Sequence, residues 1–141
     1  MIKSPVSKIH SPVTRNETAK LADIIIKSIQ EKKGDNILCL DLRKIEVAVS
    51  DYFVICHGNS STQVTAIANF VEENVFNKSN FKPWHKEGFE NRQWIVLDYI
   101  DVVVHIFQHE TREFYNIEGL WADARIQIIS DNESDKLIKV K

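Results

Sequence analysis

One apolar stretch constrains the fold of this chain more than any other part of the sequence. It consists of two apolar runs, residues 94–97 and 102–107, separated by the tetrapeptide Asp98-Tyr99-Ile100-Asp101. Both runs are short and rich in β-branched and aromatic residues, which favours two strands joined by a tight turn. Neither run alternates apolar with polar residues, so we expect both strands to be covered on both faces. The stretch therefore predicts a β-hairpin at the centre of a sheet.

The remaining pattern surrounds this hairpin with helices and further strands. Thr14 and Glu17 fit a capping box before apolar residues at helical spacing, and Gly34 is expected to end that helix. Ser60 and Gln63 form a second capping-box candidate. The order of elements predicts an α/β fold with a mixed central sheet and flanking helices. The predicted helices cover residues 14–33, 61–76, 110–116 and 117–124, and the other predicted strands cover residues 36–42, 51–56 and a short piece near 82–86.

The length of 141 residues suits one domain with its own core. Residues 1–13 contain two Ser-Pro pairs and no periodic pattern, so we expect a flexible N-terminal arm. Residues 14–124 carry the predicted α/β domain. For the C-terminal extension, residues 125–141, the pattern leaves two alternatives, disorder or an extra strand.

Charge and cysteine usage exclude several classes of function. The formal net charge of −2 gives no general attraction to nucleic acid or to an anionic membrane. No apolar run is long enough to span a bilayer and the N-terminus lacks a signal-peptide core, so a cytoplasmic location is expected. Cys39 and Cys56 lie in strand-like runs without a CxxC pair, which indicates reduced core thiols. We expect no cofactor and no metal.

Two turns could carry chemistry, but each has a simpler structural explanation. The segment from Gly58 to Ser61 precedes a helix and could bind phosphate, yet it matches no nucleotide-binding fingerprint, and helix capping by Ser60 explains it. Asp98 and Asp101 could be paired metal carboxylates of a nucleotidyltransferase. Their spacing of three across a turn does not place both on one strand face. An exposed acidic turn that meets a basic partner is a third interpretation.

The histidines and aromatic residues show no catalytic constellation. His105 and His109 are too far apart along a strand to share an ion, so we expect His105 to be hydrogen-bonded inside the sheet. Core packing is expected for at least two of the three tryptophans. Trp94 is the expected exception, because it starts a strand beside polar residues and can stay partly exposed as an interface anchor. Phe114, Leu120 and Trp121 are expected to anchor the last two helices in the core.

The chain contains a series of ordered motifs: SDYFVIC (50–56), GNSSTQV (58–64), AIA (66–68), HxEG (85–88), WIVLDY (94–99), DVVVHIF (101–107), REFY (112–115) and LW (120–121). Together they resemble the ribosomal silencing factor family, also called the RsfS or Iojap family, over residues 14–124. The resemblance implies a nucleotidyltransferase-like α/β fold without catalysis. It also implies a homodimer in the free state and a repressor of translation. The expected partner is the large ribosomal subunit, through its ribosomal protein numbered fourteen. An occupied site would block joining of the small subunit sterically.

The resemblance also implies a contact surface, and two positions depart from the family pattern. The implied partner-binding residues are Trp94, Asp98, Asp101, His85 and Glu87. Ile100 stands where the family commonly has glycine, and a β-branched residue resists positive φ, so we expect a different type of turn. His57 replaces a small hydroxyl residue. The rival hypotheses are a metal-dependent nucleotidyltransferase built on Gly58, Ser60, Asp98 and Asp101, and a generic dimeric adaptor protein.

Overall fold

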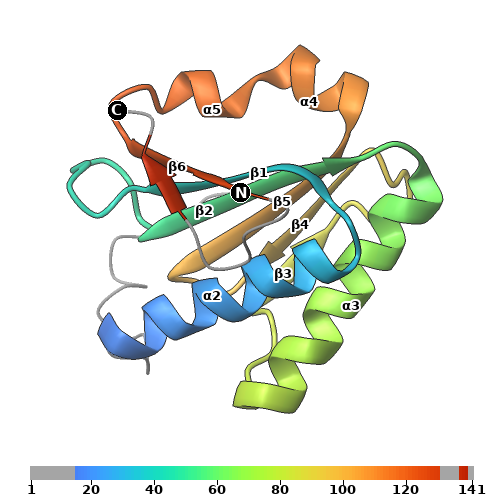
Figure 1. Cartoon of the computed structure of the whole chain (residues 1–141), viewed down its shortest axis with the longest axis horizontal. Helices are drawn as coiled ribbons and strands as arrows, with labels where there is room; N and C mark the ends of the chain where they lie inside the picture. The colour runs from blue at the N-terminus through green and yellow to red at the C-terminus, as the bar shows by residue number, and fades with distance from the viewer. Residues whose placement is uncertain (1–14, 131–136, 140–141) are drawn as a thin grey trace.

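The protein folds into three layers, with a sheet between two groups of helices (Figure 1). The structure is a computed structural model and describes residues 15–130 and 137–139. The helices are α2 (Arg15–Glu31), α3 (Ser61–Ser79), α4 (His109–Tyr115) and α5 (Ile117–Leu120). The strands are β1 (Asp35–Asp41), β2 (Tyr52–Gly58), β3 (His85–Glu87), β4 (Trp94–Asp98), β5 (Val102–Gln108), β6 (Arg125–Ile129) and β7 (Leu137–Lys139).

The described strands form one seven-stranded mixed sheet in the order β3-β4-β5-β2-β1-β6-β7. Strands β2 and β5 are parallel, and the other neighbours are antiparallel. The predicted hairpin is confirmed as β4 and β5, and the predicted mixed α/β architecture is confirmed with it. The middle position belongs to β2, however, so the hairpin lies beside the centre of the sheet.

The C-terminal extension contributes strands to the same sheet. β6 pairs with β1, and β7 pairs with β6. Of the two alternatives for residues 125–141, the extra strand is therefore confirmed for these segments. The predicted arm at residues 1–13 and the cap at Thr14 lie outside the described residues.

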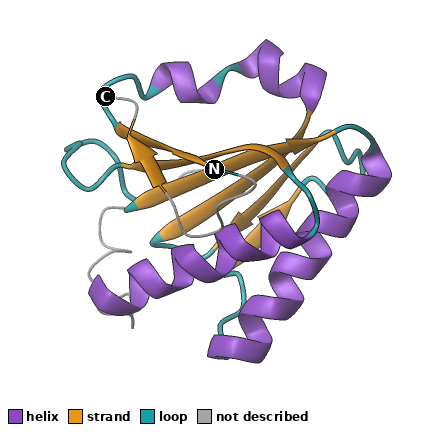
Figure 2. Ribbon diagram, viewed as in Figure 1, coloured by secondary structure: helices purple, strands orange, loops and turns teal. Residues whose placement is uncertain are grey.

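The two faces of the sheet carry different covers (Figure 2). We call the face against α2 and α3 the inner face, and the face crossed by α4 and α5 the outer face. Side chains of β4 and β5 alternate between them, so that Ile95 and Leu97 join the inner core while Phe107 joins the outer core. Both strands of the hairpin are apolar on both faces, as predicted.

Local sequence sets the ends of the two long helices, with one difference from expectation. Lys33, not Gly34, adopts the left-handed conformation at the end of α2, with φ of 61°. The N–H groups of Lys33 and Gly34 donate to the carbonyls of Gln30 and Ile29, which is the Schellman pattern. Gly34 is needed for space instead, because a Cβ there would collide with the side chain of Ile29.

At the start of α3, Ser60 acts as the N-cap and its Oγ accepts from the N–H of Gln63 at 3.1 Å, as predicted. The side chain of Gln63 accepts from the N–H of Asn59 and not of Ser60. Helix capping therefore accounts for these hydrogen bonds at the turn after Gly58. Within the described residues, no helix combines the length and apolar character needed to cross a membrane.

Candidate functional site

The expectation of an exposed acidic turn in the hairpin is wrong. Asp98 is 0% exposed and Asp101 is 4% exposed. Oδ1 of Asp98 accepts from the N–H of Ile100 at 2.8 Å, and the carbonyl of Asp101 accepts from the N–H groups of Asp51 and Tyr52. Aspartate often binds the backbone two residues ahead in this way, which satisfies the turn internally. Asp101 thus holds the turn against the start of β2, and Asp98 closes the turn within the hairpin. Both side chains are buried and are not available as a surface for a partner.

The expectation that Ile100 would avoid a positive φ, and so change the type of the turn, is also wrong. Its φ is 75°, so the turn keeps the positive φ that glycine would favour, and a β-branched residue bears the strain. Two hydrogen bonds hold the backbone of Ile100 in place: its N–H donates to Asp98, and its carbonyl accepts from Oγ of Ser50 at 2.9 Å. The tertiary contact with Ser50 compensates for a local preference that points the other way.

The residues of the nucleotidyltransferase hypothesis are not brought together. Asp98 is opposite Val103 of β5, which is opposite Phe53 of β2, whereas Gly58 lies at the other end of β2. Five residues of strand separate the two places by about 17 Å. Within residues 15–130 and 137–139, no group of three or more His, Cys, Asp or Glu residues is arranged to hold a metal ion. Cys39 and Cys56 are free and buried as predicted, and burial raises the pKa of each thiol to about 12.

Trp94 lies on the outer face and is partly exposed, as predicted. Its ring stacks on Phe107 with centroids 4.8 Å apart and contacts the ring of Tyr115 at 5.0 Å. Its Nε1 donates to Nδ1 of His105 at 3.2 Å. The prediction of a hydrogen-bonded histidine in the sheet is thus confirmed, and burial lowers the pKa of His105 to about 3. A neutral His105 therefore fixes the orientation of the Trp94 indole.

His85 and Glu87 extend the outer face toward the sheet edge. They lie on β3 opposite Asp98 and Val96, they are exposed, and their side chains form an ion pair at 2.9 Å when His85 is protonated. Gly88 follows with φ of 94°, and a Cβ there would collide with the carbonyl of Trp94. This glycine lets the β3 segment approach the start of β4, so Glu87 is carried to within two strand positions of Trp94.

Of the three expected apolar anchors of α4 and α5, Phe114 and Leu120 are exposed, and Trp121 alone packs against the outer core. Phe114 is 79% exposed and Leu120 is 76% exposed, and Ile117 is the buried apolar residue of this region. Trp121 packs edge-on against Phe53 at the margin of the outer core. The expectation that at least two tryptophans would be core residues is also wrong, since none of the three is buried and Trp84 is 65% exposed.

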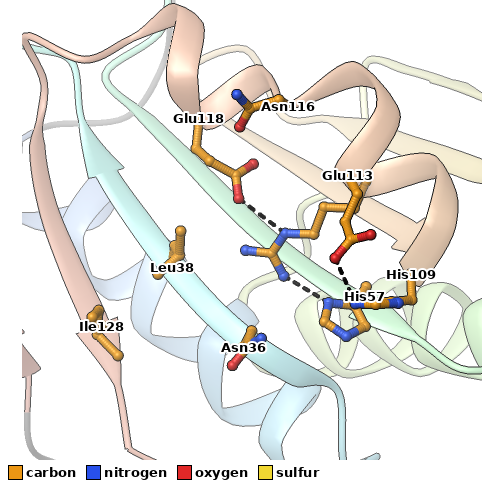
Figure 3. Close-up of a pocket in the computed structure, with 9 residues that line it drawn as sticks. Asn36, Leu38, His57, His109, Glu113, Asn116, Glu118 and Ile128 are labelled. Carbon is orange, nitrogen blue, oxygen red and sulfur yellow. Dashed lines mark hydrogen bonds and ion pairs between the residues drawn. The ribbon is translucent and has the colours of Figure 1, made fainter.

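A buried arginine takes the place of these apolar anchors. Nη1 of Arg112 donates to Nδ1 of His57 at 2.9 Å and its Nε donates to Oε2 of Glu118 at 3.1 Å, as the dashed lines in Figure 3 mark. Sequence reasoning missed this group, because the partners are 55 and 6 residues away and match no helical pairing pattern. The group lines a cavity of about 470 Å³ between β1, β6 and α4. Its lining residues are Asn36, Leu38, His57, His109, Arg112, Glu113, Asn116, Glu118 and Ile128.

The outer face thus presents an aromatic patch, which we define as Trp94, Phe114 and Tyr115. The rings of Phe114 and Tyr115 meet edge to face with centroids 5.0 Å apart, and Tyr115 is 50% exposed. Clustered exposed aromatic rings on a rigid support are typical of a surface that binds another macromolecule. This surface is therefore the candidate docking site of the protein.

Comparison with known proteins then identifies the family. Residues 15–140 match the family model described as "Ribosomal silencing factor during starvation". The chain belongs to this ribosomal silencing factor family, whose members are regulatory silencing factors and not enzymes. It is therefore a ribosome-associated factor of translation regulation.

Individual relatives agree with this assignment. The chain is 41% identical to the ribosomal silencing factor RsfS of Bacillus subtilis over 101 residues, which cover 72% of this chain and 84% of the relative. A crystal structure of a protein from Bacillus halodurans matches with a TM-score of 0.65 and 34% identity, over 73% of this chain and 94% of that one. A crystal structure of a protein from Chromobacterium violaceum matches with a TM-score of 0.68 and 31% identity, over 78% and 88%.

Proposed function

We propose that this protein represses translation by binding the large ribosomal subunit through its ribosomal protein numbered fourteen. The bound protein covers a surface that the small subunit needs, so the two subunits do not join. The mechanism is steric, and no bond is made or broken. The aromatic patch of Trp94, Phe114 and Tyr115 carries this proposal, because it is a rigid, partly exposed surface of the kind that anchors interfaces.

Charge around the patch supports a basic partner. Glu87 is exposed on β3 within two strand positions of Trp94, and Glu110 and Glu113 are exposed on α4, the helix that carries Phe114 and Tyr115. Ribosomal proteins are generally basic, so these carboxylates would steer such a protein toward the aromatic rings. In this proposal Trp94 is the main contact and His85 and Glu87 form its rim. Asp98 and Asp101 act indirectly, by holding the hairpin that presents Trp94.

The free protein is proposed to be a homodimer, with exposed apolar residues of the outer face as the surface that a second copy would cover. Large exposed rings such as those of Phe114 and Tyr115 are costly to leave in water unless a partner covers them. Measurement of the molar mass by light scattering tests this point independently of any ribosomal component.

The decisive experiment measures binding of the purified chain to isolated large subunits and to the isolated fourteenth protein. We expect the chain to sediment with large subunits and to reduce their joining to small subunits. Absence of binding at low salt would refute the proposal. Capture of partners from a lysate distinguishes this proposal from the hypothesis of a generic adaptor protein. Ribosomal proteins should dominate the captured material only if the proposal is correct.

A further inference from the structure

Arg112 is a buried cation on a short and otherwise exposed helix. Its side chain is 7% exposed, and it joins α4 to α5 through Glu118 and to β2 through His57 (Figure 3). A guanidinium is stable out of water only where partners of this kind receive its N–H groups. The places of these partners therefore decide where α4 lies on the sheet.

α4 also contacts the sheet through Tyr115, one helical turn further along, and through the ring of His109, whose centroid lies 4.7 Å from that of His57. Residues three apart lie on the same side of a helix, so Arg112 and Tyr115 approach the sheet together. Their partners occupy one row of the sheet, because Trp94 is opposite Phe107 and Phe107 is opposite His57. Two strand spacings separate Trp94 from His57, about 10 Å. α4 is thus held by a polar contact at one end of this row and by an aromatic contact at the other.

The polar contact requires a neutral His57. Nδ1 of His57 accepts from Arg112, so its proton must be on Nε2. The charged and titratable groups around His57 are Arg112, His109 and Glu113 on α4, Asp35 on β1 and, beyond the guanidinium, Glu118 on α5. Burial lowers the pKa of His57 most, followed by Arg112 and His109, while Asp35 and Glu113 act in the opposite direction. The neutral acceptor form is therefore present at neutral pH.

We propose that Arg112 is a positioning residue for the aromatic patch, and that His57 makes this positioning sensitive to acid. A solvent proton that binds Nδ1 of His57 removes the acceptor and places a second cation beside the guanidinium. Arg112 then loses its bond to His57 and keeps only the longer bond to the carbonyl of Asp35, at 3.5 Å, as its contact with the sheet. With α4 held less firmly, Tyr115 separates from Trp94. The patch is assembled at neutral pH and disassembled in acid. The role of the patch as the docking surface rests on the proposed function, but its assembly does not.

NMR of the free protein tests the assembly at pH 7 and at the acid end of a pH series, the lowest pH at which the protein stays folded. In the wild type, we expect the nuclear Overhauser contact between the rings of Trp94 and Tyr115 at pH 7 only. Protection of the α4 amides from exchange, corrected for intrinsic rates, should fall about tenfold in acid. His57→Asn keeps an acceptor near the position of Nδ1 but binds no proton, so it should keep the contact at both pH values. Arg112→Gln should lack it at both.

Control variants make each outcome of the NMR experiment either support or overturn the inference. His109→Gln removes the neighbouring titratable group and should retain the wild-type response to pH. The inference is overturned if Arg112→Gln keeps the ring contact, or if His57→Asn responds to acid as the wild type does. Should Arg112→Gln fail to fold, the comparison of His57→Asn with the wild type still decides.

A separate binding measurement relates the inference to function. At pH 7, Arg112→Gln should weaken binding to the isolated fourteenth ribosomal protein by about fivefold or more, because the guanidinium bonds to both His57 and Glu118 and each lost hydrogen bond corresponds to about fivefold. If the wild type does not bind that protein, the proposed function fails, and the NMR comparison decides the role of Arg112 on its own. If both proteins bind equally while the ring contact is lost in the variant, Arg112 does not position the docking surface.

Discussion

The two faces of the sheet are built from the same strands, yet they are covered in different ways. The inner face lies under α2 and α3 and contacts them through apolar side chains such as Ile25, Ile67 and Leu97, all 0% exposed. The outer face lies under the short helices α4 and α5, which contact it through Arg112 and Ile117 and expose Phe114 and Leu120. A continuous apolar contact leaves nothing for a partner to bind. A cover held at a few points leaves aromatic surface free for docking.

This difference assigns stability and recognition to opposite sides of one sheet. Stability comes mainly from the inner face, where burial of apolar area is complete. Recognition uses the outer face, where side chains are fixed by specific contacts such as the bond from Trp94 to His105. Four substitutions or changes of condition can break or sharpen this contrast.

The largest effect is expected for truncation on the inner face. Leu97→Ala removes a fully buried side chain and should lower the free energy of unfolding by roughly 2–5 kcal/mol. Leu120→Ala on the outer helices should change it by less than about 0.5 kcal/mol, because Leu120 is 76% exposed. Urea denaturation measures both. Equal losses would contradict the division between the two faces.

Acid should weaken the fold through His105 on the outer face. Its pKa is lowered from 6.5 to about 3, so the unfolded chain takes up a proton that the folded chain does not. Stability is then lost as the pH falls from about 6.5 toward 3, by about 1.4 kcal/mol per pH unit. His105→Asn keeps an acceptor for Trp94 without a titrating group. The stability of this variant, measured by urea denaturation between pH 7 and 5, should fall less steeply than that of the wild type.

Loss of the Trp94 ring should affect binding more than folding. Trp94→Ala should weaken binding to large subunits by about 2 kcal/mol, because the ring is the best-fixed member of the patch. Trp84→Ala is the matched control. Trp84 is more exposed than Trp94, and its N–H donates to the carbonyl of Asp98, at the end of β4 opposite to Trp94. Equilibrium sedimentation measures both affinities. Unchanged affinity in a folded Trp94→Ala variant would remove this residue from the docking surface.

The smallest effect is expected at the hairpin turn. Ile100→Gly relieves a positive φ that costs about 1–2 kcal/mol but loosens the unfolded chain, so a net gain of roughly 0.5–1 kcal/mol is expected. Ile100→Ala removes the side chain and keeps the strain, and should bring no gain. Thermal unfolding of both variants tests this. A stabilised Ile100→Ala would show that φ is not the source of the strain.

Local sequence was sufficient for the fold class and for most of the elements, but it did not decide the strands β6 and β7, and it extended the last helix to residue 124 whereas α5 ends at Leu120. The non-alternating runs of β4 and β5 predicted strands covered on both faces, and the serine at position 60 predicted the start of α3. The hydrogen-bonded state of His105 followed from its place inside an apolar run. These features depend on neighbours within a few residues, so the order of residues alone specifies them.

The candidate site was predicted only in part, because exposure depends on what packs over a residue. The partial exposure of Trp94 was predicted, but the burial of Asp98 and Asp101 was not, since it depends on β2 lying beside the turn. The positive φ of Ile100 is held by Ser50, fifty residues earlier in the chain. Local preference therefore gave the wrong turn.

The amino-acid sequence by itself determined the two long helices, most strands, the coverage of the hairpin on both faces and the resemblance to a family. The tertiary structure decided which face is sealed and which is left partly open, and it brought Arg112 to His57 from 55 residues away. The physical reason is the distance along the chain over which each effect acts. Backbone preference and hydrophobic period act within one element, whereas burial and charge pairing arise only when distant elements pack together.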